Sequence, residues 1–203
     1  MSALAALALA SCPHPYMPLS TGQTWTYRLT DGAEVTLAVQ SVESGDGWQS
    51  AAVGAWLSAD ADDPVVTTTF ACGEEGLVLP LGAAALAGRA RVETLQERGV
   101  SLLPAARLTK GAEWESDRVL RVTADARSLT TALSSRHRVA GREKVKTPAG
   151  TFDALRIDVS TSALAGGAEK PRARRTTLWF ARDVGLVKMQ GDAELTLVRR
   201  ERR

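Results

Sequence analysis

The chain has 203 residues, of which 25 are Lys or Arg and 23 are Asp or Glu, so its formal net charge is only +2. This balance is too even to indicate nucleic acid or another acidic partner. The apolar share of 44% is typical of a globular protein, and the length suits one domain with a sizeable core. Runs rich in Thr, Val and Leu, separated by Gly and Pro, favour an all-β fold.

The first eleven residues form an uncharged, apolar stretch. Its apolar run, 3–10, is far shorter than the roughly 20 residues that span a bilayer, but it fits the hydrophobic region of a signal peptide. The sequence Leu9-Ala10-Ser11-Cys12 then resembles a lipobox, in which the cysteine thiol receives diacylglycerol. We therefore predict a lipoprotein signal peptide over 1–11 and lipidation of Cys12. An ordinary signal peptide, or a chance cysteine after alanines, is the alternative.

Residues 12–22 are predicted to form the lipidated cysteine and an extended tether with several prolines. His14 is interpreted as an ordinary tether residue, because metal ligands are lacking nearby. Acyl chains on Cys12 would anchor the protein stably. By similarity to the enterobacterial sorting rule, Pro13 favours the outer membrane, with the protein facing the periplasm. The rest of the chain, 23–203, is predicted to be a single antiparallel β domain.

Alternation of apolar and polar residues predicts three strands at the start of the domain. Trp25, Tyr27 and Leu29 share one face of the first strand, and Asp31-Gly32 after them is a strong hairpin signal. A second strand over 35–39 and a third over 48–57 follow, separated by a glycine-rich turn. The domain is therefore expected to open with a three-stranded meander.

Two features of the next segment could carry chemistry. Asp60, Asp62 and Asp63 could offer oxygens to calcium, but the glycine and the distal Glu of a calcium loop are missing, so a solvated turn is predicted. Cys72 is expected to be a buried, inert thiol if Cys12 is lipidated. If Cys12 is not lipidated, a disulfide between the two cysteines becomes available.

The segment 82–96 is the one stretch with helix-favouring composition, although its apolar residues form no clean stripe. It is expected to be a short helix or an irregular crossover that covers the open face of the sheet, or else a plain connector. Further along, His137 follows Ser134 and Ser135 on a predicted strand over 129–139. Adjacent residues do not make a catalytic triad, which needs spatial geometry. We therefore predict a strand histidine that has a satisfied hydrogen bond or lies at a solvated edge.

The C-terminal part, 141–190, reads as an antiparallel sheet with Pro and Gly at its reversals. It resembles a family of exported bacterial lipoproteins, mostly of unknown function, and the opening of the chain is similar to that family's usual start. The resemblance implies a curved antiparallel sheet or half-barrel like that of the lipoprotein carriers LolA and LolB, and it brings no catalytic residues. The residues that carry it are Val145, Thr147-Pro148-Ala149-Gly150-Thr151-Phe152, Ala154-Leu155, Ile157, Trp179-Phe180-Ala181, Val184-Gly185-Leu186-Val187-Lys188, Tyr16, Pro18-Leu19, Gly22, Trp25 and Tyr27.

Two basic clusters lie near the end of the chain, one over 169–175 and one over 199–203. They could contact anionic lipid headgroups, at about 1 kcal/mol for each cation near a charged surface. Solvated loops and a frayed terminus also explain the two clusters, and we favour this second interpretation.

Three classes of function remain. The favoured one is a non-enzymatic, lipid-anchored envelope lipoprotein that binds or carries an apolar ligand in a curved sheet. The alternative is a structural or interaction lipoprotein with a filled core and an envelope protein as partner. An enzyme is the third, but no catalytic motif supports it. We predict no cofactor, no bound metal and no nucleic-acid partner, with the membrane contacted through acylated Cys12. Five residues are candidate liners of a ligand cavity: Trp25, Trp48, Trp56, Trp114 and Trp179.

Overall fold

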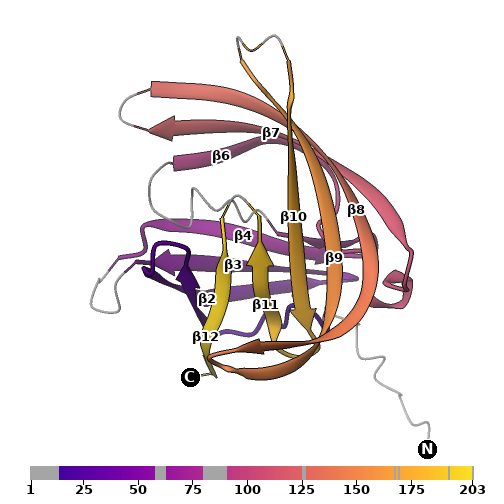
Figure 1. Ribbon diagram of the computed structural model, residues 1–203. Coiled ribbons are helices and arrows are strands. Elements are labelled where there is room, and N and C mark those ends of the chain that lie inside the picture. The colour runs from indigo at the N-terminus through magenta and orange to yellow at the C-terminus, as the bar shows by residue number, and fades with distance from the viewer. Residues whose placement is uncertain are drawn as a thin grey trace, which may run out of the picture.

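A computed structural model describes residues 14–57, 63–79, 91–124, 127–166, 168, 170–191 and 193–202. These residues form strands and one short 3-10 turn, η1, so the predicted all-β class is confirmed (Figure 1). The elements are β1 (Gln23–Leu29), β2 (Glu34–Gly45), β3 (Trp48–Trp56), β4 (Val66–Gly73), β5 (Gly76–Val78), β6 (Arg91–Gly99), η1 (Ala105–Arg107), β7 (Glu113–Ala124), β8 (Arg127–Thr147), β9 (Gly150–Ala165), β10 (Arg172–Ala181), β11 (Gly185–Gln190) and β12 (Leu195–Arg202).

All the strands belong to one open antiparallel sheet, in the order β5-β4-β3-β2-β1-β12-β11-β10-β9-β8-β7-β6. Strands that follow one another in the chain therefore pair, except β5 and β6, which form the two edges. In the middle of the sheet the first strand pairs with the last, so that Gln23 faces Arg202 and Leu29 faces Leu195. The two edges, β5 and β6, come from the middle of the chain. The predicted opening meander is β1–β3.

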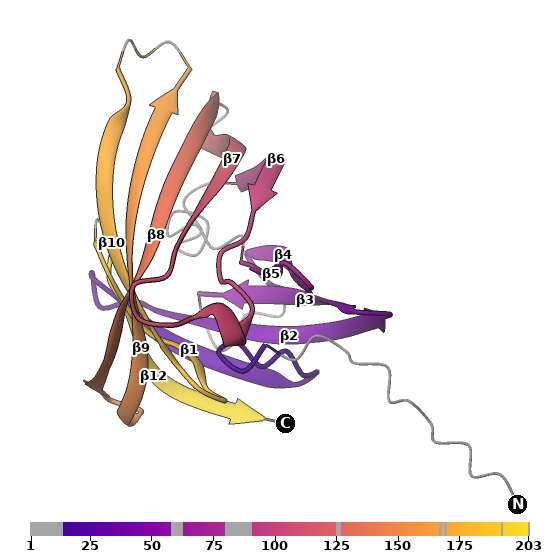
Figure 2. The same ribbon diagram turned by 90° about the vertical axis from the view of Figure 1, so that its right-hand side faces the viewer.

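The sheet is strongly curved, and its two halves run crosswise to each other. β8, β9 and β10 stand upright while β2, β3 and β4 lie across them (Figures 1 and 2). β8 and β9 are long enough to bend, and their register shifts between Val139 and Gly141. A further shift lies between Trp179 and Phe180 in the β10–β11 pair. Such bulges increase the local twist, which lets a long sheet wrap around a concave side.

The reversals follow from residues that accept unusual backbone angles. Gly32 has a φ of 85° in the β1–β2 hairpin, and Gly150 has a φ of 137° where β8 turns into β9. Asp183, at a φ of 59°, is the one non-glycine residue with a positive φ among the described residues, in the turn between β10 and β11. Gly and Asp tolerate these conformations, so the turn signals in the sequence lie at the observed reversals.

Residues 14–19 pack into the core, which differs from the extended tether predicted over 12–22. Tyr16, Met17 and Leu19 are buried, and His14 is only 4% exposed. The His14 Nε2–H donates to the carbonyl of Leu103 at 2.9 Å, and the amide of Asp183 donates to the carbonyl of Pro15 at 2.7 Å. The apolar area of three large side chains is too costly to leave in water, so this stretch docks on the sheet.

The segment 82–96 also differs from expectation in the part that the structure describes. Residues 91–96 belong to the edge strand β6 and are mostly exposed, while the rest of the segment lies outside the described residues. Charged residues on an exposed strand are a common protection for a sheet edge. No helix among the described residues is long and apolar enough to cross a membrane.

Candidate functional site: a cavity on the concave side

A cavity of about 310 Å³ lies on the concave side of the sheet, within the size range of small-molecule sites. Its base continues the hydrophobic core, and its upper part is lined by hydroxyl groups, one histidine and two arginines. Strands β7 to β12 supply most of the wall. The lining residues are Leu79, Ser101, Ser116, Arg118, Leu133, Ser135, His137, Val159, Thr161, Ala163, Arg174, Thr176, Leu178, Phe180, Leu186, Met189, Ala193 and Leu195.

Cross-strand register explains why these residues meet. Ser116 on β7 lies opposite Ser135 on β8, which lies opposite Thr161 on β9, which lies opposite Arg174 on β10. Paired residues in neighbouring strands point to the same face of a sheet. One row of the concave wall is therefore made of three hydroxyl residues and one arginine. The Ser135 and Thr161 hydroxyl oxygens are 2.9 Å apart, within hydrogen-bond distance.

His137 occupies a buried polar position beside this row. Its Nε2 is 2.9 Å from the Ser116 hydroxyl, and its ring stacks on Trp114 with the centroids 4.9 Å apart. The Trp114 indole N–H donates to the carbonyl of Val100, which fixes the stacked pair. His137 Nδ1 is buried and has no hydrogen-bond partner among the described residues. The prediction of a strand histidine with a hydrogen bond is confirmed for Nε2.

Arg118 joins the wall of the cavity to the segments around Leu79 and Ser101. Its guanidinium donates to the Leu79 carbonyl at 3.1 Å and to the Ser101 hydroxyl at 2.7 Å. Glu97 Oε1 lies 2.6 Å from Arg118 Nε, although the N–H does not point at the carboxylate and makes no hydrogen bond. The charge of Arg118 is therefore balanced by Glu97, and its hydrogen bonds hold the cavity rim together.

Burial decides the protonation state of both histidines. Desolvation, with a smaller contribution from the Arg118 charge, lowers the pKa of His137 from 6.5 to about 4. Desolvation also lowers the pKa of His14, against an opposing effect of its hydrogen bond to Leu103. Both side chains are therefore neutral at pH 7.

Acid is expected to destabilise the fold through His137. Between pH 6.5 and 4 the unfolded chain takes up a proton that the folded protein refuses, so stability falls as pH falls through this window. The loss that His137 contributes at pH 4.5 is roughly 2–3 kcal/mol. His137→Gln should remove this part of the pH dependence, measured as the difference in unfolding free energy between pH 7 and 4.5 in urea. His14 is present in both proteins and cancels. An equal drop in the variant and the parent would contradict the assignment.

None of the five predicted tryptophans lines the cavity, although all five are described. Trp25 is fully buried in the core, and Trp48 is 45% exposed near the β2–β3 turn. Trp114 lies behind His137 and borders a separate surface hollow next to β4 and β5. The ring of Trp56 lies beside Gly54 on the same strand. The Trp179 indole N–H donates a hydrogen bond to the Glu143 carboxylate, and the Lys188 ammonium lies above the Trp179 ring.

Cys72, on β4, is 3% exposed and takes part in a disulfide bond. The predicted burial is therefore confirmed, and of the two states predicted for this thiol the structure has the disulfide-bonded one. The free thiol is the state predicted for a chain whose other cysteine, Cys12, carries a lipid. Cys12 lies outside the described residues, so its lipidation stays a prediction, and acylation of its thiol would exclude a disulfide at the same atom.

The carboxylates Asp60 and Asp62 lie outside the described residues as well.

Sequence reasoning singled out His137 and Ser135, but it missed Ser116, Arg118 and Thr161 as residues of the cavity. Ser116 and Arg118 alternate on β7, but a Ser and an Arg at such positions usually face water. The available signal was the row of small hydroxyl residues at matching positions in β7, β8 and β9, which becomes visible only when the strand register is known.

Comparison with solved structures shows that the fold is similar to that of two bacterial proteins. A candidate exported protein of Bacteroides fragilis with a YmcC-like fold superimposes with a TM-score of 0.65 at 12% identity, over 92% of this chain and 98% of that one. A candidate lipoprotein of Parabacteroides distasonis gives a TM-score of 0.62 at 13% identity, over 92% and 98%. At these identities the similarity shows the fold alone.

Sequence comparison adds a family match over part of the chain. A family model described as DUF3108-like matches residues 108–191, which contain β7 to β11 and most of the cavity wall. A comparison with curated proteins gives no match. The likeness to LolA and LolB stays a prediction.

Proposed function

We propose that this protein is a lipid-anchored lipoprotein of the cell envelope that binds or carries an apolar ligand in the concave cavity, without catalysis. The observation that carries the proposal is the cavity itself: the curved sheet leaves a space of about 310 Å³ whose base is made of aliphatic and aromatic side chains. Apolar walls with a few placed polar groups are typical of ligand sites.

Two further observations support the envelope location. The sequence Leu9-Ala10-Ser11-Cys12 has the form of a lipobox. Proteins of the same fold include a candidate exported protein and a candidate lipoprotein. We place the protein at the outer membrane, facing the periplasm and held by acylated Cys12.

A role without catalysis fits the polar groups of the cavity. Ser116 and His137 are within hydrogen-bond distance, which is the beginning of a nucleophile–base pair. However, no Asp or Glu is among the described lining residues, so the histidine has no orienting carboxylate. The alternative of a filled core with a protein partner is less consistent with an open, mostly apolar cavity.

Filling the cavity should abolish uptake of an apolar ligand. Ala163 lines the cavity and Leu164, its neighbour on β9, points to the other face and is 43% exposed. We expect Ala163→Trp to weaken binding of the neutral dye Nile red at least tenfold, because the indole occupies the space of the ligand. Leu164→Trp should bind the dye like the parent. The full chain carrying Cys12→Ser is used, so that no detergent competes.

The comparison of the two variants decides between the functions. Equal dye binding in Ala163→Trp and the parent would mean that the cavity is not the site, and no binding by the parent would remove the carrier proposal. Circular dichroism and a urea midpoint for both variants establish that each is folded.

A further inference from the structure

Residues 14–19 are held at one place on the domain by contacts of several kinds. The His14 Nε2–H donates to the carbonyl of Leu103, and the side chain of Arg142 donates to the Tyr16 hydroxyl. Tyr16 itself is only 2% exposed. Figure 2 shows this segment as an indigo coil beside η1. The contacts therefore fix the point at which the N-terminal part of the chain joins the folded domain.

The chain between this point and the proposed lipid is very short. Cys12 precedes His14 by two residues. Two residues span at most roughly 7 Å, whereas the extended tether predicted over 12–22 would reach roughly 35 Å. The headgroup layer on each side of a bilayer is roughly 5–8 Å deep. An acylated Cys12 therefore keeps His14 in or next to the headgroup layer.

Strand pairing shows which parts of the domain surround the docked segment. Leu102, next to Leu103, forms a bridge with Leu77 on β5. β5 pairs with β4, whose end lies opposite the start of β3 near Trp48. η1 and the turn at 110–111 follow Leu103 along the chain. The β2–β3 turn, the β4–β5 turn, η1 and the turn at 110–111 therefore lie at the same end of the domain as the docked segment.

This end, which we call the anchor end, is defined by the exposed side chains of Trp48, Glu74, Glu75, Arg107 and Lys110. Trp48 is 45% exposed. A tryptophan ring is favoured at headgroup level, because its body is apolar and its N–H is polar. The charges beside it have both signs, so attraction to anionic lipid is not what brings this end to a membrane.

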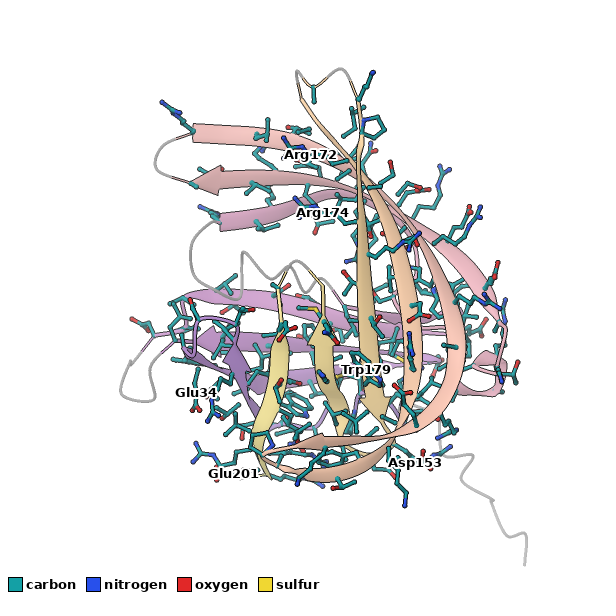
Figure 3. All side chains as sticks on the ribbon, in the orientation of Figure 1. Glu34, Asp153, Arg172, Arg174, Trp179 and Glu201 are labelled. Atoms are coloured by element: carbon teal, nitrogen blue, oxygen red, sulfur yellow. The ribbon has the colours of Figure 1, made fainter. Side chains whose placement is uncertain are left out.

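We propose, on the basis of the lipid anchor proposed above, that the anchor end rests on the headgroup layer of the membrane and gives the domain one orientation on the bilayer. The two-residue link brings the anchor end to the surface, and Trp48 enters the headgroup layer. The upper part of β10, with Arg172, lies at the far end of the domain (Figure 3). The basic cluster over 169–175 is then turned toward water, as in the solvated-loop interpretation of that cluster.

The test compares how close two sites lie to the bilayer. Lys110→Cys and Arg172→Cys are made separately in the full chain carrying Cys72→Ser, so that each protein with acylated Cys12 has one thiol for a fluorescent dye. The labelled proteins are inserted into preformed phosphatidylcholine vesicles that contain lipids with a nitroxide quencher on the headgroup. We expect the dye at 110 to lose about half of its fluorescence or more and the dye at 172 to be unaffected, because the short link holds only the anchor end at the headgroups.

A longer link is the matched control. About ten Gly and Ser residues inserted between Pro13 and His14 have an end-to-end distance of roughly 17 Å, which releases the domain from the headgroups. Quenching at 110 should then fall to the level at 172, and circular dichroism establishes that each variant is folded. Equal quenching at the two sites without the insertion would overturn the proposal. Unchanged quenching at 110 after the insertion would also overturn it, because the short link would then have no effect on orientation.

The outcomes separate this inference from the function on which it rests. Proteins that carry acyl chains and insert into vesicles, but show equal quenching at both sites, overturn the inference and leave the anchor in place. A protein whose intact mass shows no acyl chains, and which does not insert into vesicles, overturns the anchor of the proposed function itself.

Discussion

Trp25→Ala is expected to destabilise the fold by about 4 kcal/mol, because it removes a large side chain from the core and leaves a void. Trp25 is fully buried on β1, and its indole N–H donates to the Val184 carbonyl at 2.6 Å. The ring thereby joins β1 to the turn before β11. For a domain of this size such a loss corresponds to a fall in Tm of roughly 10 °C. Denaturant unfolding followed by circular dichroism measures the change in unfolding free energy, and thermal unfolding measures the change in Tm.

Trp48→Ala is the matched control for that experiment. Trp48 has the same side chain but is 45% exposed near the β2–β3 turn. Its loss should cost less than about 1 kcal/mol, since most of its surface is already in water. Similar losses in the two variants would show that Trp25 does not have the structural role assigned to it.

Cys12→Ser is expected to release the whole protein from membranes, because the hydroxyl cannot take the place of the thiol that receives the lipid. The measurement is fractionation of cells followed by carbonate washing of the membranes, with intact mass of the purified protein. The parent should carry the mass of the acyl chains. A variant that stays with the membranes as the parent does would contradict the anchor at Cys12.

Cys72→Ser provides the control, since the structure has Cys72 in a disulfide bond. If Cys12 carries lipid, Cys72→Ser should remain anchored like the parent, and Cys72 in the parent should react with a thiol reagent after unfolding. An unlipidated parent without a free thiol would instead favour the disulfide and contradict the proposed anchor.

The strands were predictable from the sequence, because the alternation of apolar and polar residues and the residues that form turns are visible within a few neighbouring positions. The pair Asp31-Gly32 and the glycine at Gly150 mark reversals that the structure contains. The docking of residues 14–19 was harder to predict, since prolines dominate that stretch although Tyr16 and Met17 are apolar. The edge strand β6, which ends at Gly99, was not predictable either. Its first residues belong to the segment 82–96, whose helix-favouring composition gave no indication that it pairs with β7.

The residues that line the cavity could not be predicted from sequence, because they are brought together from distant strands. Glu97 and Arg118 meet only because β6 and β7 pair in one register. The five tryptophans do not line this cavity, and Trp25 is instead used in the core, where large aromatic residues bury much apolar area. Most of the lining residues are Leu, Ser, Thr and Ala, which no single strand makes conspicuous.

The pairing of β1 with β12 has a consequence for how the protein acquires its structure. β1 is flanked on one side by β2, its neighbour in sequence, and on the other by the last strand of the chain. A chain that emerges from a ribosome or a membrane channel with its N-terminus first cannot fill the middle of the sheet until residues 195–202 have emerged. Contacts of such long range make folding slow. A chain of this topology therefore reaches its final structure only after its last strand is free to pair with β1.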